Sequence, residues 1–490
     1  MHSSPQTRRL ALLPRCFTLP LRGGEASDSN GIQPVPKIDE PPVWAKEKRA
    51  LLLMDVFSEY HGYYLAHRAR ELYGVATIFV FSDYMRGFFE QSRPEDLDEM
   101  LGMCMPDSNE AKEWCRHLNG IELTAISCES DSGLADAERL GVILGLTYHD
   151  GFNEARRNKY LMNEAAGDAG LSIVKQRLCK NVAEAIAFAT ELGIESQASS
   201  NQPMVVVKPV RGVASDDVFL CTNLRSVESA FRKIHGSTIF GSPHDTYNEV
   251  LLQEFASGQE YAVDIVSKNG QHKIAAIWKY DKRPANGAPF VYYATKICDE
   301  SDAKLVFNYL SRCLDALGIR WGLSHNEVII TADGPRLVEV NCRQHNMDFC
   351  PITMACIGYN ALDMLLSAYF GGKDPDFYPA EAEGERLDWD LIPTIPAKRM
   401  HGAMIHLVNY QQGKLAEVNE IALREIHEME SVLDMQVYGA FLEIGAEISP
   451  TRDIRSDAGW VQLINEDQEQ FQKDFERIVE LMPSLFIVES

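Results

Sequence analysis

Apolar and polar positions follow a strand, helix, strand pattern from residue 49 onward. The apolar runs ALLLMDVF at 50–57 and VATIFVF at 75–81 flank a helical stretch from Tyr64 to Tyr73. Strands that alternate with helices in this way are typical of βαβ units, which build parallel sheets. A strand at 120–126 and a helix at Leu134–Leu144 continue the pattern. The sequence therefore predicts a small, Rossmann-like N-terminal domain of the α/β class. Beyond this domain, the stretches 153–171 and 351–369 are each predicted to form a helix.

Polar residues follow two strands of this predicted sheet. Ligands of open α/β sheets lie beyond the carboxyl ends of the strands, which makes Asp55, Ser58, Glu59 and the run from Cys128 to Ser132 candidates for a substrate wall. Simple turn chemistry is the alternative explanation. The domain lacks a GxGxxG turn, so no dinucleotide is assigned to it.

Strict alternation marks the stretch DGPRLVEVNCR, which ends at Arg343. Its strand carries Glu339, Asn341 and Arg343 at every second position, so the three side chains share one face. Glu327 lies in the preceding apolar run, LSHNEVII, and a hairpin would bring its carboxylate alongside. Two carboxylates and an amide oxygen suit Mg²⁺, which prefers oxygen ligands. An edge hairpin with a solvated polar face is the alternative.

Two earlier apolar runs carry residues suited to a nucleotide. The run MVVVKPVRGVAS places Lys208 at a strand end, before a turn whose peptide N–H groups could cover phosphates. In LLQEFASGQEYAVD, the connection from Phe255 to Gly258 could read an adenine edge through its backbone, and Glu260 could accept hydrogen bonds from ribose. A lysine that extends to water and a solvated strand-end carboxylate are the alternatives.

Composition and charge exclude several classes of protein. The 490 residues include 71 Asp and Glu against 47 Lys and Arg, a net charge of −24, which argues against a general nucleic-acid binder. No apolar run has the length of a membrane span. The 11 cysteines form no CxxC pair or zinc-site spacing, which favours a reduced, cytoplasmic compartment. Residues 1–45 carry four arginines before the first acidic residue, and they indicate either a disordered extension or an organellar transit segment.

Four of these runs together resemble the motifs of the ATP-grasp superfamily: RRNKYLM at 156–162, VVVKPVRGVAS at 205–215, LLQEFASGQEYAVD at 251–264 and GPRLVEVNCR at 334–343. Over about residues 49–485 the chain resembles the carboxylate–amine ligases that include bacterial L-amino acid ligases and carnosine synthase. The resemblance implies an α+β ATP-grasp domain of two subdomains at 151–398, with a lid at about 171–255. It would follow the extension 1–45 and the α/β domain 46–150 and precede a small α+β ligase subdomain at 399–490.

The resemblance also implies a role for each motif residue. The phosphates of ATP would be bound by Lys159, Lys208 and the loop from Gly212 to Ser215, adenine would be contacted by Glu254, Phe255 and Ala256, and ribose by Glu260. Two Mg²⁺ ions, with Mn²⁺ as an alternative, would be held by Glu327, Glu339 and Asn341. Arg343 would stabilise the reaction intermediates. The implied substrates are a small carboxylate, expected to be an amino acid, and an amine. The implied reaction passes through an acyl phosphate and releases ADP and phosphate.

The chain departs from that family after Arg343, where QHNMDF at 344–349 stands in place of a Gly-rich turn. Gln344, His345 and Asn346 either bind the acceptor substrate or help to cap the next helix, and the cap is favoured. His325 either orients a metal ligand or packs within its hairpin. Two other functions remain open, namely phosphorylation of an enol or hydroxyl before amine capture, and ATP sensing without chemistry. A homodimer is an option for the assembly.

Overall fold

The computed structural model describes residues 49–82, 84–85, 122–196, 203–212, 217–239, 241–371 and 386–489. Three parallel strands form the N-terminal sheet within these residues, in the order β2-β1-β3. The prediction of a small parallel α/β sheet is confirmed. The elements are β1 (Arg49–Met54), α1 (Tyr64–Tyr73), β2 (Ala76–Val80), β3 (Glu122–Cys128) and α4 (Leu134–Leu144).

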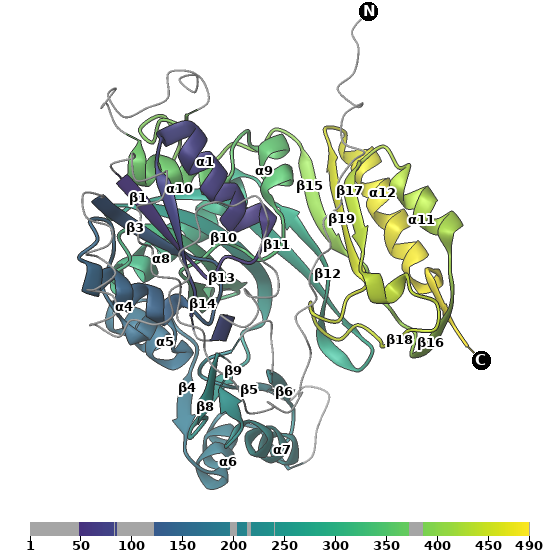
Figure 1. Cartoon of the computed structure of the whole chain (residues 1–490). Coiled ribbons are helices and arrows are strands. Elements are labelled where there is room, and N and C mark those ends of the chain that lie inside the picture. Colours follow the sequence, from purple (N-terminus) through teal and green to yellow (C-terminus); the bar gives the residue numbers. More distant parts are fainter. Residues whose placement is uncertain are drawn as a thin grey trace, which may run out of the picture.

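A second, four-stranded sheet lies at the bottom of the view in Figure 1 and carries two helices. Its strand order is β4-β9-β5-β6, and all its strand pairs are antiparallel. The elements are β4 (Gln176–Cys179), α6 (Val182–Glu191), β5 (Val205–Lys208), β6 (Phe219–Cys221), α7 (Leu224–Ile234) and β9 (Val250–Glu254). The short hairpin of β7 (Thr238–Ile239) and β8 (Ser242–Thr246) precedes β9.

An eight-stranded sheet forms the centre of the described structure (Figure 1). Its order is β14-β13-β10-β11-β12-β15-β19-β17. The strands are β10 (Gly258–Lys268), β11 (Gln271–Ala285), β12 (Ala288–Ile297), β13 (Gly322–Thr331), β14 (Gly334–Asn341), β15 (His401–His406), β17 (Val432–Val437) and β19 (Gly459–Asn465). Alternation along β10 places Tyr261, Val263 and Ile265 in one apolar cluster with α5 (Lys159–Asp168) and α8 (Glu300–Ala316).

Helices complete the molecule on both sides of this sheet. The helix α10 (Ala361–Phe370) is buried along its whole length and packs between the N-terminal sheet and β10. The helices α11 (Glu420–His427) and α12 (Gln468–Leu481) cover the C-terminal strands, beside a small sheet of β18 (Glu447–Ile448), β16 (Gly413–Val418) and β20 (Phe486–Val488). Hydrophobic burial of this kind contributes roughly 25 cal/mol per Å² of apolar surface.

Two helices expected from the sequence are interrupted. The stretch 153–171 contains a 3₁₀ turn (Glu154–Arg156) and then α5, because Asn158 adopts an extended backbone and caps the N–H groups of Tyr160 and Leu161. The stretch 351–369 divides into α9 (Cys350–Cys356) and α10, where Asn360 caps the second helix. Asparagine is a strong N-cap residue, so each break has a local cause.

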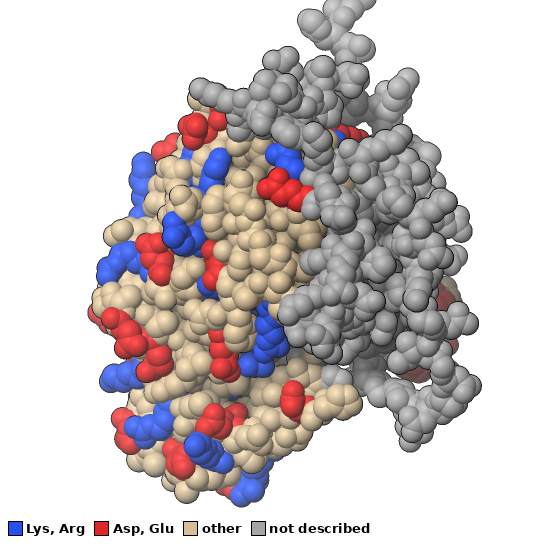
Figure 2. Space-filling model, turned by 60° about the vertical axis from the view of Figure 1, so that its left-hand side comes forward, with Lys and Arg blue, Asp and Glu red and all other residues tan. Residues whose placement is uncertain are grey.

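Among the described residues on the face in Figure 2, acidic and basic side chains are interspersed with uncharged ones, and they form no large field of one charge. None of the helices in the described ranges combines the length and the apolar composition needed to cross a membrane.

Candidate functional site

The hairpin of β13 and β14 brings the two predicted metal-ligand carboxylates together. Glu327 and Glu339 are direct partners in the antiparallel register, and His325 is opposite Asn341. Asn341 Nδ2 donates a hydrogen bond of 2.8 Å to Glu339 Oε1, and Arg157 donates one of 3.4 Å to Asn341 Oδ1. The predicted hairpin is therefore present, and it places three oxygen-bearing side chains next to one another.

Two lysines face this carboxylate cluster from different elements. Lys159, the first residue of α5, has its Nζ 2.6 Å from Glu339 Oε2, and it donates a hydrogen bond of 3.1 Å to the carbonyl of Gly212. Lys208, the last residue of β5, is buried. Burial lowers the pKa of Lys208 to about 8, and the neighbouring Lys159 ammonium adds to this effect. Two ammonium groups side by side favour a polyanionic ligand between them.

Glu260 is held by a lysine that the sequence analysis did not identify. Lys282 on β11 donates to both carboxylate oxygens of Glu260 at 2.8 Å. Its ammonium also lies over the rings of Tyr280 and Tyr292, at 4.6 and 4.5 Å from their centroids. Burial raises the pKa of Glu260, opposed by Lys282. The ribose role of Glu260 remains a prediction. Positions 280 and 282 alternate along one strand and so share a face, and this pattern could have identified Lys282 from the sequence.

Arg343 is fixed by a carboxylate from the N-terminal sheet. Its Nε and Nη2 atoms each lie 2.8 Å from an oxygen of Asp131, in the loop after β3. Arg157 contacts the same carboxylate at 3.3 Å. Burial would raise the pKa of Asp131, but the two guanidinium groups hold it below its ordinary value. Asp131 belongs to the run 128–132 that the sequence marked as a candidate wall, and the structure shows that it acts on Arg343.

The other polar residues of that wall mainly bind one another. Asp55 accepts hydrogen bonds from the backbone and hydroxyl of Ser82 and from the hydroxyl of Ser130. Glu129 accepts from the Ser58 hydroxyl and from two backbone N–H groups. These contacts match the turn-chemistry alternative. The side chain of Glu59 lies outside what the structure describes.

The expected adenine segment lies where β9 ends and β10 begins. Glu254 Oε1 accepts a hydrogen bond of 2.9 Å from the Lys175 backbone, and the Phe255 backbone N–H donates to the Met204 carbonyl at 3.1 Å. Ala256 follows in the connection to β10. Gly212 lies beside Lys159, whereas Ser215 falls outside the described residues. The nucleotide roles of these residues remain predictions.

The segment after Arg343 is held from the N-terminal side as well. His61 Nε2 is 3.1 Å from the carbonyl oxygen of Met347, and Met347 has a left-handed backbone with φ of 73°. The expected helix cap is wrong, because the N-cap of α9 is Phe349 and no side chain caps it. Contacts to other elements, such as that of His61, therefore help to shape residues 344–349.

His325 contacts both Glu327 and Asp264. Its Nδ1 is 3.1 Å from Asp264 Oδ1 and its Nε2 is 3.6 Å from Glu327 Oε1. Burial opposes charge on His325, but the hydrogen bonds to these carboxylates raise its pKa to about 9. Burial, together with the neighbouring His325, lowers the pKa of His345 to about 4. His325 thus lies behind a predicted metal ligand, as one of the two sequence alternatives states.

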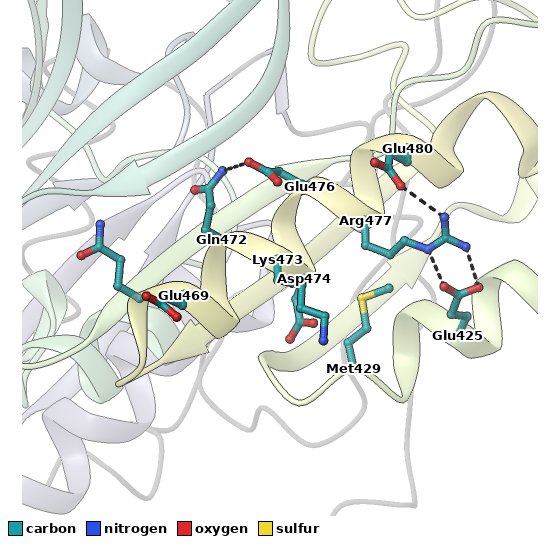
Figure 3. A pocket seen from close by; sticks show the side chains of 10 residues that line it. Glu425, Met429, Glu469, Gln472, Lys473, Asp474, Glu476, Arg477 and Glu480 are labelled. Carbon is teal, nitrogen blue, oxygen red and sulfur yellow. Dashed lines mark hydrogen bonds and ion pairs between the residues drawn. The ribbon is translucent and has the colours of Figure 1, made fainter.

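A separate hollow of about 910 Å³ lies between α11 and α12 (Figure 3). It is an open groove on the C-terminal part of the chain, and Arg477 bridges it with an ion pair of 2.6 Å to Glu425. The groove contains none of the residues described above.

Known proteins are similar to parts of this chain. Residues 201–349 match the model of the ATP-grasp domain. The chain is 31% identical to dapdiamide A synthase of Enterobacter agglomerans over 256 residues, which cover 51% of this chain and 58% of that protein. It is 27% identical to human carnosine synthase 1 over 187 residues, or 37% of this chain and 20% of that protein. The chain thus spans less than two thirds of either relative.

Solved structures share the fold over most of the chain. The L-amino acid ligase from Bacillus licheniformis has a TM-score of 0.63 at 15% identity and covers 91% of this chain and 100% of its own. A carboxyaminoimidazole ribonucleotide synthase from Aspergillus clavatus, solved with ATP, has a TM-score of 0.60 at 11% identity, with 90% and 100% covered. Residues 201–349 are thus similar to ATP-grasp domains. The expected resemblance to ATP-grasp carboxylate–amine ligases is confirmed.

Proposed function

We propose that this protein is an ATP- and Mg²⁺-dependent ligase that joins a small carboxylate, expected to be an amino acid, to an amine. The observation that carries the proposal is the direct pairing of Glu327 with Glu339 on β13 and β14, beside Asn341 and opposite Lys159. Carboxylate and amide oxygens are the ligands that Mg²⁺ prefers, usually shared with substrate phosphates. The donor set therefore fits this ion, which when bound neutralises charge on the transferring phosphoryl group.

The lysines and Arg343 provide the remaining charge. Lys159 and Lys208 would bind the triphosphate, and phosphoryl transfer depends mainly on such positioning and charge neutralisation. A carboxylate oxygen attacks the γ-phosphorus, the bond to ADP breaks, and an acyl phosphate forms. The amine nitrogen then attacks the acyl carbon, phosphate leaves with the electron pair of its C–O bond, and the amine loses a proton. Arg343, held rigidly by Asp131, would stabilise the oxyanion that develops.

The predicted division into the ranges 46–150, 151–398 and 399–490 fits this reaction. A mobile lid at about 171–255, carrying Lys208, would exclude water from the acyl phosphate. Similarity to dapdiamide A synthase and to the fold of an L-amino acid ligase supports a carboxylate and an amine as substrates.

The test is a screen of amino-acid pairs with ATP and Mg²⁺, with ADP and phosphate measured separately. We expect ADP and phosphate in equal amounts, only when both substrates are present. Release of AMP and pyrophosphate would exclude the mechanism. Hydroxylamine should trap the acyl phosphate as a hydroxamate, and a phosphorylated enol or alcohol in its place would identify the alternative reaction. Tight ATP binding without turnover in any mixture would identify a sensor.

A further inference from the structure

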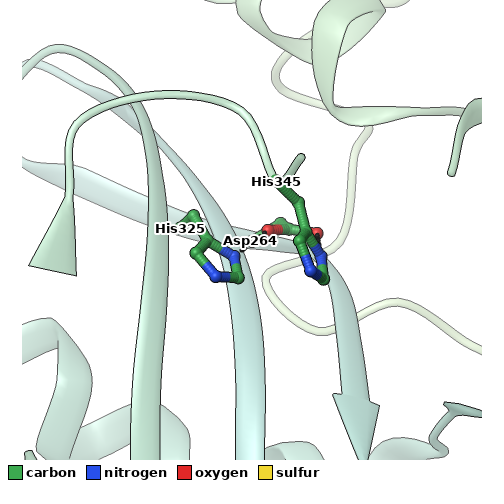
Figure 4. Close-up of side chains that lie close together, drawn as sticks. All are labelled: Asp264, His325 and His345. Atoms are coloured by element: carbon green, nitrogen blue, oxygen red, sulfur yellow. Dashed lines mark hydrogen bonds and ion pairs between the residues drawn. The ribbon is translucent and has the colours of Figure 1, made fainter. Parts of the chain in front are cut away.

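Two imidazoles and one carboxylate meet behind Glu327. Asp264 is on β10, His325 on β13 and His345 in the segment after β14, and their exposed fractions are 2%, 4% and 7%. One possible ligand atom of each residue lies within 4.8 Å of the other two. Figure 4 shows the Asp264 carboxylate beside both rings, whose centroids are 4.1 Å apart. The three side chains thus form a compact buried cluster from separate parts of the chain.

Each ring directs one nitrogen into the cluster and the other away from it. His325 Nδ1 lies 3.1 Å from Asp264 Oδ1, and His345 Nδ1 lies 3.7 Å from Asp264 Oδ2. On the outer side, His325 Nε2 lies 3.6 Å from the Glu327 carboxylate, and His345 Nε2 lies 3.3 Å from the Tyr280 hydroxyl. Metal-binding histidines usually donate their outer N–H to such a partner, which fixes the tautomer and leaves the other nitrogen for the metal.

The inner nitrogen of His345 has no hydrogen-bond partner among the described residues, although it is buried. A buried lone pair that faces a carboxylate is unfavourable unless a proton or a cation lies between them. In a four-coordinate site with metal–ligand bonds of about 2.0–2.1 Å, neighbouring ligand atoms are about 3.3 Å apart. The two distances of 3.1 and 3.7 Å lie on either side of that value.

We propose that Asp264, His325 and His345 form a binding site for a divalent transition-metal ion, with Zn²⁺ as the expected occupant. Imidazole nitrogens favour zinc and its neighbours over Mg²⁺, which prefers oxygen. Trp278 Nε1 donates a hydrogen bond of 2.8 Å to Asp264 Oδ2 and would hold the carboxylate in place. The ion would connect the β13 strand behind Glu327 to the segment 344–349. The proposal does not depend on the ligase reaction.

The experiment uses the full chain, freed of metal by a chelator and titrated with Zn²⁺ or Co²⁺ without ATP. We expect one equivalent of Zn²⁺ per chain, not displaced by millimolar Mg²⁺, and visible Co²⁺ absorption from nitrogen and oxygen ligands. His345→Ala should weaken Zn²⁺ binding by at least about 100-fold, because it removes a direct ligand. His406→Ala is the matched control, since His406 is also buried and lies 2.8 Å from a carboxylate, that of Asp457.

Circular dichroism checks that each variant folds. If His345→Ala does not fold, Asp264→Asn serves as the second variant. Stoichiometric Zn²⁺ binding that either variant abolishes and the control retains supports the site. Absence of Zn²⁺ binding by the wild-type protein, or equal binding by all variants, overturns it and leaves a shared proton as the cation between the rings and Asp264. Either result leaves the ligase proposal unaffected, because that proposal is tested by ADP release.

Discussion

Asp131 and Arg343 form a two-pronged ion pair, with both N–O distances at 2.8 Å, although 212 residues separate them in the chain. The carboxylate comes from the N-terminal sheet and the guanidinium from the end of β14. Because both side chains are buried, the pair fixes Arg343 in one orientation relative to the Glu339 face of the hairpin.

Asp131→Asn should destabilise the protein because it leaves buried guanidinium charge unneutralised. Removal of one partner from a buried ion pair costs about 3–5 kcal/mol, and we expect the free energy of unfolding in urea to fall by about 3 kcal/mol. Glu228→Gln is the control, since its pair with Arg232 is exposed and exposed pairs contribute about 0.5 kcal/mol. An equal loss of unfolding free energy in the two variants would show that Asp131 does not neutralise buried guanidinium charge.

Glu339→Gln should abolish turnover while the fold survives. The neutral amide removes the negative charge that Glu339 contributes to the metal site, a loss of several kcal/mol of charge stabilisation, so ADP release should fall by at least about 100-fold. The free energy of unfolding should change by no more than about 1 kcal/mol. Glu425→Gln, which disrupts an exposed ion pair with Arg477, should leave ADP release unchanged. Near-wild-type turnover of Glu339→Gln would exclude this residue as a metal ligand.

Nucleotide affinity should weaken as the pH rises above 8. The pKa of Lys208 in the free protein is about 8, and bound phosphates would raise it, so ATP binding takes up a proton between those two pKa values. Calorimetry should show affinity that falls by up to about tenfold per pH unit in that window. Lys208→Gln should bind ATP more weakly at pH 7 and lose this pH dependence. An unchanged slope in the variant would assign the proton to another group.

Gly258→Ala should weaken the connection between β9 and β10. A Cβ atom at this position would clash with the Ile330 carbonyl oxygen on the paired strand, so the backbone has to move. Overpacking of this kind costs about 1–3 kcal/mol, measurable by urea unfolding, and it should also reduce ATP affinity. Gly439→Ala is the control, since a Cβ there meets no described atom within 4 Å. Equal stability of the two variants would contradict the close approach.

Local patterns predicted those parts of the site in which sequence neighbours meet. The β13–β14 hairpin has a short turn, so alternation alone placed Glu327 beside Glu339. The break before Lys159 was missed because the apolar pattern continued through it, although Asn158 carried the cap signal.

Contacts between distant segments could not be predicted in the same way. Lys282 meets Glu260 only because β10 and β11 pair with a register shift after Asp264, and no local signal fixes such a shift. The pairing of Asp131 with Arg343 requires the N-terminal sheet to pack against the central one. The cluster of Asp264, His325 and His345 likewise depends on how three separate segments come together.

The contact between His61 and Met347 has a consequence for engineering. The segment 344–349 owes part of its shape to a histidine that lies 286 residues earlier in the chain. Its left-handed residue, Met347, is strained in isolation. A transplant of residues 344–349 alone into a related ligase would therefore lose the conformation that the segment has here. The π-helical turn Glu59–Tyr63, which bears His61, and the segment would have to be exchanged as one unit.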